Sequence, residues 1–420
     1  MFNQRKLEFD VVVVGGGSAG VAAAVGAANV GAKTLIVERN PYFGGAGTHS
    51  SVFSYCGFFA QAEPLQQVVG GVGAQFLAEL SAIGPEIEPR RNPASGNVIV
   101  IADGEKSKYA LDRLLLRAGV VPRLHCQVIG AQVQGNRVVE IECVDHAGRL
   151  TVSADAFVDA SGEADLTTLA GGAVRFGDDE GQVQAGTLVM RIGGVARDVP
   201  IARELFTEAI QLGKQAGIDT LSKEKGMVLR LASGDILALF VDESVNGLDA
   251  ASLTAAEMSA RQQAWSYLDV FRRHVPGFES AYLIQTGPAL GIRETRHVRG
   301  QYTLAGEDVL SGVRHLDAVA RGGWPVEIHQ PGAPAVYQQI RDKSYYDIPL
   351  RSLAVEGFSN LWCAGRIISC DAIAFASARV MGTAFATGHA AGVAAAQSTR
   401  FTHPDADLVR AELLRQGALV

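Results

Sequence analysis

The order of apolar and polar residues predicts that the chain opens with a β-α-β unit. An apolar run at residues 11–14 leads into a glycine turn, which is followed by an alanine-rich segment at residues 18–28 and a second apolar run at residues 33–38. Short apolar runs beside turn residues are typical of buried strands, and the longer segment has the length of a helix. We therefore predict two parallel strands joined by a crossover helix.

Further along the chain the pattern changes from helix to short strands. A leucine-rich segment at residues 109–118 is predicted to be helical, and apolar runs follow at residues 123–126, 128–134, 137–144, 149–153 and 156–160. Turn residues such as Gly135 and Asn136 separate these runs. This spacing indicates a β-meander beside the parallel sheet.

The middle of the chain mixes predicted strands with predicted helices. Predicted strands at residues 186–192, 227–231 and 236–241 alternate with predicted helices at residues 200–215 and 252–274, and glycine- and alanine-rich sequence returns at residues 360–397. We predict an α/β protein with a Rossmann-like nucleotide-binding domain, made of a parallel sheet and the β-meander. That domain is discontinuous, comprising residues 1–173 and 344–420, and the inserted residues 174–343 form an α+β substrate domain.

Composition narrows the class of protein. The 420 residues are 48% hydrophobic and 19% charged, which is typical of a folded chain, and the net charge is −7. Nucleic acid is not an expected partner, because phosphate binding needs a basic surface stripe that the sequence lacks. The five cysteines include no CxxC pair, so we expect no disulfide framework, no metal site and a reducing, cytoplasmic location.

Two long apolar stretches, at residues 11–32 and 372–397, could be mistaken for membrane spans. Both are rich in glycine and alanine, and the second contains Arg379 and His389, which are costly in lipid. We therefore expect buried helices and strands, and no membrane as a partner. The oligomeric state, including a homo-oligomer, is left open.

The glycine turn has the spacing of a dinucleotide-binding motif. Gly15 permits the tight turn, Gly17 lets the backbone approach a pyrophosphate, and Gly20 lets the helix pack closely on its strand. The helix would direct free N–H groups and its positive end at the phosphates. Glu38, at the end of the second strand, would accept hydrogen bonds from the ribose hydroxyls. The alternative is a glycine-rich turn that binds no nucleotide.

Two later segments favour FAD over NAD. Each is an apolar strand running into a small-residue turn, at residues 157–165 and 361–366. Together with Gly44 and Gly45 they resemble motifs of the flavoprotein superfamily that includes fumarate reductase-like enzymes. More closely, the chain resembles the FAD-dependent oxidoreductases of the FAD_oxidored type, through residues 291–296, 327–329, 346–353, 364–369 and 379–381.

The resemblance implies a set of FAD contacts. They are Gly15, Gly17, Ser18, Ala19, Gly20, Glu38, Arg39, Gly44, Gly45, Val128, Ala160, Gly162, Asp165, Gly365, Arg366, Val380 and Met381. It also implies that the helix beginning near Arg379 directs its N-terminus at the N1–O2 edge of the flavin. We find no second strand–GxGxxG–helix unit in the middle of the chain, which favours the substrate itself as the reductant.

Arg293 and His297 are candidate catalytic residues. If residues 282–303 contain an extended strand, both side chains lie on one face with Thr295, and Glu294 and Arg296 lie on the other. Arg293 would anchor a substrate carboxylate or stabilise the reduced flavin, or else form an ion pair with Glu294. The alternative for His297 is a packing or solvated histidine.

His329 follows an apolar strand and precedes a turn, so a base there could face a cleft. The alternative is a histidine that stabilises the turn. Tyr346 and Asp371 are further catalytic candidates. His49 and Cys56 follow Gly44 and Gly45, in a segment that runs close to the flavin ring in the resembling fold. They would line the pocket or carry a covalent flavin link, and Cys56 could instead be simply buried.

These observations leave three hypotheses of function. The first is FAD-dependent oxidation of a small organic substrate by hydride transfer to flavin N5, with dioxygen or another acceptor reoxidising the flavin. The second is an oxygen-using flavoenzyme that hydroxylates or oxidatively desulfurises a small heterocycle. The third is a binding module without redox activity, as in the escort proteins of prenylated GTPases that resemble flavoproteins.

Overall fold

The computed structural model describes residues 5–84, 87–92, 95–400 and 404–420. Its main sheet, within these residues, contains β1 (Arg5–Val14), β2 (Thr34–Val37), β6 (Val121–Arg123), β7 (Gln127–Gln134), β8 (Arg137–Asp145), β9 (Gly148–Asp159) and β20 (Leu361–Cys363). The strands β6, β2, β1, β9 and β20 run parallel in this order, and β8 and β7 continue the sheet as an antiparallel meander. The predicted α/β fold with a parallel sheet is confirmed.

The long strand β9 joins the two parts of this sheet. Its first half pairs with β8 and its second half with β20, while β1 pairs along nearly its whole length. The prediction of two strands, at residues 149–153 and 156–160, is wrong. Ser153 and Ala154 are half-buried and Asp155 is exposed, which interrupts the apolar pattern. The backbone stays extended because β1 pairs with β9 on both sides of this interruption.

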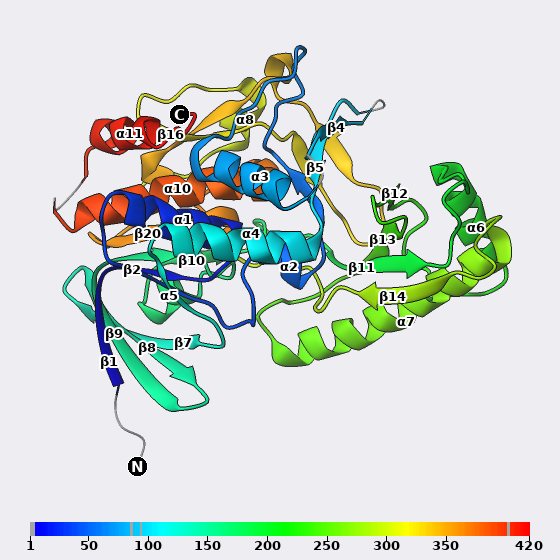
Figure 1. Ribbon diagram of the computed structural model, residues 1–420, viewed down its shortest axis with the longest axis horizontal. Helices are drawn as coiled ribbons and strands as arrows, with labels where there is room; N and C mark the ends of the chain where they lie inside the picture. The colour runs from blue at the N-terminus through cyan, green and yellow to red at the C-terminus, as the bar shows by residue number, and fades with distance from the viewer. Residues whose placement is uncertain (1–4, 85–86, 93–94, 401–403) are drawn as a thin grey trace.

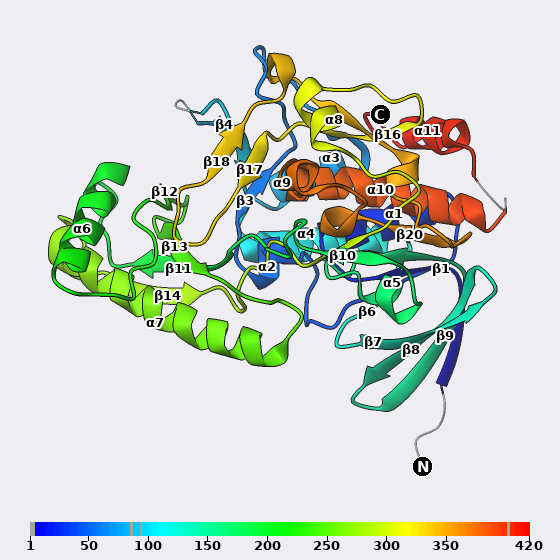
Figure 2. The same cartoon turned by 180° about the vertical axis from the view of Figure 1, so that it is seen from behind.

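Helices α1 (Ser18–Asn29) and α10 (Met381–Ser398) pack side by side against the sheet (Figures 1 and 2). Small residues allow the close approach, since a Cβ atom on Gly388 would lie 2.1 Å from the carbonyl oxygen of Ala19 and one on Gly392 2.0 Å from that of Ala23. Both helices are almost completely buried. In the described ranges we find no helix with the length and apolarity needed to cross a membrane.

A layer of shorter elements covers these helices. It contains α2 (Ala46–His49), β3 (Ser54–Cys56), α3 (Gly71–Ile83), β4 (Pro89–Arg91), β5 (Val98–Ile101) and α4 (Gly104–Arg117). Helix α5 (Asp165–Leu169) lies elsewhere, against β7 and β9. The helix predicted at residues 109–118 is α4, which begins earlier because Asp103 caps it through the N–H groups of Glu105 and Lys106.

A second sheet extends from one end of the molecule (Figures 1 and 2). It consists of β11 (Gly186–Gly193), β12 (Met227–Arg230), β13 (Ile236–Glu243) and β14 (Tyr282–Thr286), and α6 (Arg203–Gln215) and α7 (Ala250–His274) pack on it through a separate apolar cluster. Because that cluster draws its buried residues from positions 188–290, it occupies a narrower range than the predicted substrate domain of residues 174–343.

The remaining elements lie outside the second sheet, one of them before it in the chain and the others after it. They are β10 (Val174–Phe176), β15 (Arg296–Val298), α8 (Gly306–Ser311), β16 (Ala318–Gly322), β17 (Val326–Ile328), β18 (Val336–Gln338), β19 (Tyr346–Pro349), α9 (Ala372–Ala378), α11 (Ala406–Arg415) and 3₁₀ turns at Arg341–Lys343, Leu350–Ser352 and Gly365–Ile367. The extended strand considered for residues 282–303 is present only as β14 and β15, and irregular chain that includes Arg293 and Glu294 separates them.

Candidate active site

The glycine turn after β1 has the geometry that a dinucleotide needs. Gly15 has φ +96°, and a Cβ atom there would lie 2.3 Å from the carbonyl oxygen of Ala160. A Cβ atom on Gly20 would lie 1.8 Å from the carbonyl oxygen of Gly15. Gly17 is different, since its nearest neighbour would be the Cα atom of Gly45 at 3.8 Å. Gly15 and Gly20 therefore allow close backbone packing within the fold, whereas the missing side chain of Gly17 leaves space for a ligand.

The N-terminus of α1 adjoins this space. Its N-cap is Gly17, no side chain caps the helix, and its first turn, which includes Ser18 and Ala19, contains no acid. The helix therefore presents free N–H groups and the positive end of its dipole. Backbone of this kind fits a pyrophosphate.

Glu38 lies beside the turn and is buried. Its Oε2 atom accepts a hydrogen bond from the Gly16 N–H at 2.6 Å, and its Oε1 atom accepts one from Asn40 at 2.8 Å. Each carboxylate oxygen retains a second lone pair for a ribose hydroxyl. The neighbouring Arg39 is exposed, and Val128 lies on β7 just after Cys126, whose N–H donates to the carbonyl oxygen of Glu38.

A second glycine pair forms the opposite wall of the turn. Gly44 (φ +120°) forms a parallel β-bridge with Gly17, and its N–H donates to the Gly16 carbonyl oxygen at 2.8 Å. Gly45 has φ +55°, and a Cβ atom there would lie 3.0 Å from the Cα atom of Gly17. The two glycine segments can approach this closely because neither carries a side chain.

The turns after β9 and β20 lie next to each other. Ala160 is tied to β1 through its N–H, which donates to the Val14 carbonyl oxygen at 2.8 Å. The Arg366 guanidinium packs over Gly162 and donates from Nε to its carbonyl oxygen at 2.7 Å. Arg366 also pairs with Glu163. Arg366 therefore has protein partners of its own, and its predicted FAD contact stays a prediction.

Two further predicted FAD contacts lie near these turns. Asp165 pairs with Arg296 at 2.8 Å, and Gly365 has φ +78° at the start of a 3₁₀ turn. A Cβ atom on Gly365 would lie 3.0 Å from the Ala19 side chain in α1. This position brings Gly365 close to the nucleotide turn.

The helix α10 begins at Met381, and its N-cap, Val380, offers no side-chain hydrogen bond. The end of β3 crosses this helix terminus, since a Cβ atom on Gly382 would lie 2.7 Å from the carbonyl oxygen of Cys56. Arg379, the C-cap of α9, comes just before. This arrangement fits a helix N-terminus facing a partly negative ligand edge.

Glu327 organises a cluster of polar side chains beside Arg379. Its Oε1 atom lies 3.2 Å from Nε2 of His329, and its Oε2 atom accepts a hydrogen bond from Nε1 of Trp324 at 2.9 Å. The hydroxyl group of Tyr337 also donates to Oε1. Arg379 donates to the carbonyl oxygen of Glu327 at 3.1 Å, with its charge 3.8 Å from the carboxylate. The Glu327 side chain is 13% exposed.

The charges of this cluster determine the protonation state of His329. Burial alone would raise the pKa of Glu327, but its contacts with His329, Arg379 and Tyr337 outweigh burial and lower this pKa, so the carboxylate is ionised. Burial, and then the charge of Arg293, lower the pKa of His329 to about 4, although Glu327 opposes this shift. A neutral imidazole that donates from Nε2 to Glu327 has its lone pair on Nδ1. That nitrogen is buried and has no hydrogen-bond partner among the described residues.

Arg293 lies on the irregular chain between β14 and β15. Its guanidinium donates to the carbonyl oxygen of Ala185, and burial together with the charge of Arg379 lowers its pKa to about 10. The suggested ion pair with Glu294 is not formed. The two oxygens of Glu294 are used by Nε2 of His297, at 2.9 Å, and by the N–H of Gln184, at 3.0 Å.

His297 is buried against Phe375, with the two rings 4.5 Å apart and nearly perpendicular. His297 contacts Glu294, so the two side chains do not lie on opposite faces as they would in an extended strand. The condition for that arrangement is not met, because residues 292–295 are irregular. The surroundings of His297 are those of a packing histidine. Its proposed catalytic role stays a prediction.

The remaining candidates differ in their surroundings. His49 ends α2, its ring lies 5.9 Å from that of Tyr42, and burial lowers its pKa. Burial raises the pKa of the Cys56 thiol well above its ordinary value, so the thiol stays protonated. Tyr346 is buried and its hydroxyl lies 2.9 Å from Oγ of Ser377. Asp371 caps α9 and also accepts a hydrogen bond from the Gly306 N–H. The structure therefore gives Tyr346 and Asp371 structural contacts, and their catalytic roles stay predictions.

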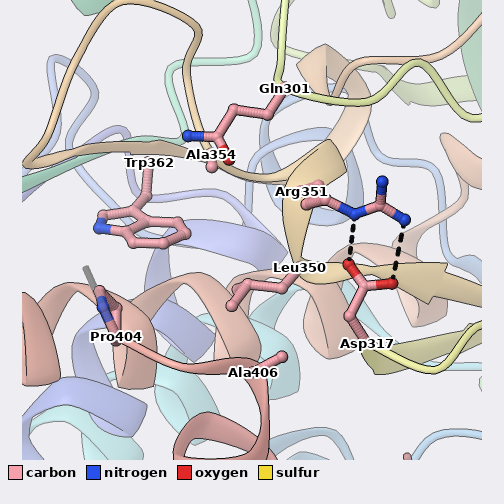
Figure 3. Close-up of a pocket in the computed structure, with 8 residues that line it drawn as sticks. All are labelled: Gln301, Asp317, Leu350, Arg351, Ala354, Trp362, Pro404 and Ala406. Atoms are coloured by element: carbon pink, nitrogen blue, oxygen red, sulfur yellow. Dashed lines mark hydrogen bonds and ion pairs between the residues drawn. The ribbon is translucent and has the colours of Figure 1, made fainter.

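A surface cavity of about 410 Å³, drawn in Figure 3, shares no lining residue with the Glu327 cluster. It is lined by Gln301, Asp317, Leu350, Arg351, Ala354, Trp362, Pro404 and Ala406. Its charged pair, Arg351 and Asp317, is satisfied internally at 2.8 Å. It contains none of the predicted site residues.

Glu327, Arg379 and Trp324 are not among the predicted site residues, although Glu327 and Arg379 lie in segments on which the resemblance rests. A signal for Glu327 was available, because residues two apart on a strand point to the same face and Glu327 stands two residues before His329. Arg379 comes from a distant part of the chain, and no spacing in the sequence connects it to His329. Trp324 stands five residues before His329, an odd separation that the alternation of a strand would place on the opposite face.

The glycine turn, its acid and the uncapped helices define a Rossmann-like dinucleotide-binding protein. The chain belongs to the FAD dependent oxidoreductase family, whose sequence model matches residues 10–416. It is therefore an enzyme and its cofactor is FAD, which excludes the binding-module hypothesis. Membership also means that it acts on a small molecule and passes electrons to an acceptor.

Individual relatives match only parts of the chain. It is 50% identical over 50 residues to 3-oxosteroid 1-dehydrogenase of Mycobacterium tuberculosis (strain CDC 1551 / Oshkosh), covering 12% of this chain and 9% of that relative. It is 27% identical over 169 residues to thiamine thiazole synthase of Aeropyrum pernix, covering 39% of this chain and 58% of that relative. The chain thus spans well under two thirds of both.

Among solved structures, BexE, studied for oxidation during BE-7585A biosynthesis, has a TM-score of 0.52. The two are 13% identical, and the match covers 97% of this chain and 66% of that one. At this identity the likeness shows the fold alone.

Proposed function

We propose that this enzyme oxidises a small organic substrate by removing a hydride from carbon and a proton from a neighbouring oxygen or nitrogen. His329 accepts the proton at Nδ1. The observation that carries this proposal is the buried Nδ1 atom, which belongs to a neutral ring and has no hydrogen-bond partner among the described residues. A base of this kind is ready to accept a proton at neutral pH.

Bound FAD supplies the two-electron acceptor, because its N5 atom takes up the hydride. The loss of H⁻ and H⁺ converts a C–OH or C–NH group into C=O or C=N. The two electrons leave the enzyme to dioxygen or another acceptor, so atoms and charge balance. In this assignment Gly17, Gly45, Glu38 and the first turn of α1 hold the dinucleotide.

The protein environment supports a cycle of proton uptake and release at His329. When His329 takes a proton, its positive charge faces the Glu327 carboxylate at 3.2 Å. The same carboxylate holds the ring through Nε2 before the reaction, so the ring need not turn. Trp324 and Tyr337 hold the carboxylate in place through their own hydrogen bonds.

Anaerobic mixing of the FAD-loaded enzyme with a panel of alcohols, amines, hydroxy acids and amino acids tests the proposal. We expect at least one of them to bleach the flavin band, and His329→Asn to keep its FAD but bleach about a hundredfold or more slowly. Bleaching by NADH or NADPH, with none by the panel, would instead support the oxygen-using alternative. Equal rates in wild type and His329→Asn would remove His329 as the base.

A further inference from the structure

We propose that the substrate is a carboxylate and that Arg293 and Arg379 hold its anionic group from the two sides of His329. The proposal rests on the proposed function for the role of His329. It adds Arg379 as a binding residue and a chemical class of substrate.

Hydrogen bonds connect both arginines to the base. Arg293 donates to the carbonyl oxygen of Ala185, and the N–H of Ala185 donates to the carbonyl oxygen of His329 at 3.2 Å. Arg379 donates to the carbonyl oxygen of Glu327, two residues before His329. A single residue therefore separates each guanidinium from the backbone or side chain of His329. The charges of both arginines also lower the pKa of His329, so an anion held by both would lie in the neighbourhood of this ring.

The charges of the cluster do not cancel. Two cations, Arg293 and Arg379, face one ionised carboxylate, Glu327, while His329 is neutral. Asp242, the next acid near Arg293, is paired with Lys223 at 3.1 Å. One positive charge therefore remains in a site that is largely shielded from water, and such a charge is costly unless an anion compensates it.

Unused hydrogen-bond donors point to the same ligand. Nε of Arg379 is buried and has no acceptor in the part of the chain that the structure describes, and the Arg379 side chain is only 12% exposed. Arg293 has one backbone acceptor and forms no ion pair within the described residues. Guanidinium groups bind carboxylates with two parallel hydrogen bonds, and that geometry also orients the rest of the molecule.

Binding of acetate and benzoate to the FAD-loaded enzyme, each compared with its neutral amide, tests the proposal without turnover. We expect perturbation of the flavin spectrum, with a dissociation constant at least about tenfold lower for each acid than for its amide. Arg293→Met and Arg379→Met should each weaken binding of the acids about tenfold or more and leave the amides unchanged. Arg293→Lys and Arg379→Lys should fold more readily and recover part of the loss.

Arg273→Met is the matched control, because it removes one positive charge from an exposed position in the last turn of α7. It should bind both acids like wild type. Equal affinity for acids and amides, or equal affinity of the wild type and both Lys variants, would overturn the proposal. Either result would leave the proposed function intact, because bleaching by a neutral alcohol or amine would still support it.

Discussion

The carboxylate of Glu38 accepts a hydrogen bond from the backbone N–H of Gly16 at a distance of 2.6 Å. One side chain therefore closes the glycine turn and faces the expected position of the nucleotide. A carboxylate serves both tasks because each oxygen can accept more than one hydrogen bond.

Glu38→Ala should weaken FAD binding by roughly ten- to a hundredfold, since a hydrogen bond to a charged group contributes about 1.5–3 kcal/mol. Equilibrium titration of the apoprotein with FAD measures this. Glu38→Gln keeps the shape of the side chain and one acceptor. Its FAD affinity should therefore lie between those of Glu38→Ala and wild type. Wild-type affinity in a folded Glu38→Ala protein would mean that the ribose is held elsewhere.

Gly17→Ala should impair FAD binding, whereas Gly20→Ala should impair the stability of the protein. Gly17 has φ −71° and open space ahead of it, so alanine should leave the stability of the apoprotein within about 0.5 kcal/mol of wild type while FAD affinity falls at least about tenfold. An alanine at Gly20 meets the Gly15 carbonyl oxygen and should lower the melting temperature of the apoprotein itself. Thermal unfolding with and without FAD separates the two effects. If Gly17→Ala binds FAD normally, the pyrophosphate does not approach this residue.

The sequence predicted the nucleotide turn well because its signals are local. Gly15, Gly17 and Gly20 stand at fixed spacings between a strand and a helix, and each spacing has a steric reason that the structure repeats. The strands β7 and β8 were predictable for the same reason, since a tight turn lies between them. The rest of the predicted meander was less accurate, because β9 is one strand and residues 124–126 form none.

Prediction failed where contacts between distant residues decide the conformation. The faces assigned to Arg293, Glu294 and His297 depended on alternation in an extended strand. In the structure Glu294 contacts His297 and Gln184, and alternation does not encode these contacts. Arg379 reaches Glu327 across 52 positions of sequence. Only the folded chain brings these groups together, so the candidate active site was predicted in part.

Denaturation by acid or heat should release FAD from the protein in unmodified form. A covalent link through Cys56 requires a thiolate, and burial holds the pKa of this thiol far above neutrality. Precipitated protein should therefore be colourless, with FAD in the supernatant. Flavin that stays with the precipitated wild type but not with His49→Ala or Cys56→Ser would identify that residue as the covalent attachment.

Stability should fall in mild acid because of His389. His389 lies on α10 and is buried against Gly26 of α1 and Gly71 of α3. Burial lowers its pKa from 6.5 to about 4, despite a 2.8 Å contact with Gln416 and the nearby Glu412. Below pH 6.5 the unfolded chain binds a proton that the folded protein does not take up, so the free energy of unfolding decreases as pH falls from 6.5 to about 4. This one group accounts for at most about 3 kcal/mol.

Urea unfolding at a series of pH values measures this effect. His389→Gln should reduce the slope of stability against pH over that interval, whatever its effect at pH 7. His146→Gln, at an exposed turn, is the control and should keep the wild-type slope. An unchanged slope in His389→Gln would show that other groups cause the acid sensitivity.

Glu327→Gln should slow substrate-dependent bleaching of the flavin by about a hundredfold or more. Glutamine keeps the volume and the contact with Trp324 but loses the charge, and its amide can donate to Nε2 of His329. The proton of the neutral ring would then lie on Nδ1, which could no longer accept one from the substrate. In wild type the rate should decrease as pH falls through about 4, because protonation of His329 removes the base.

Two further variants distinguish positioning from simple loss of structure. Glu327→Asp retains the charge and should recover part of the rate, whereas Tyr337→Phe removes one donor to the carboxylate and should cost much less than Glu327→Gln. All three variants should retain FAD, because none of these side chains belongs to the nucleotide turn. The charge of Glu327 raises the pKa of His329 in wild type. In Glu327→Gln the remaining bleaching rate should therefore begin to fall at a lower pH than in wild type. A merely structural role for Glu327 would leave the pH of this fall unchanged.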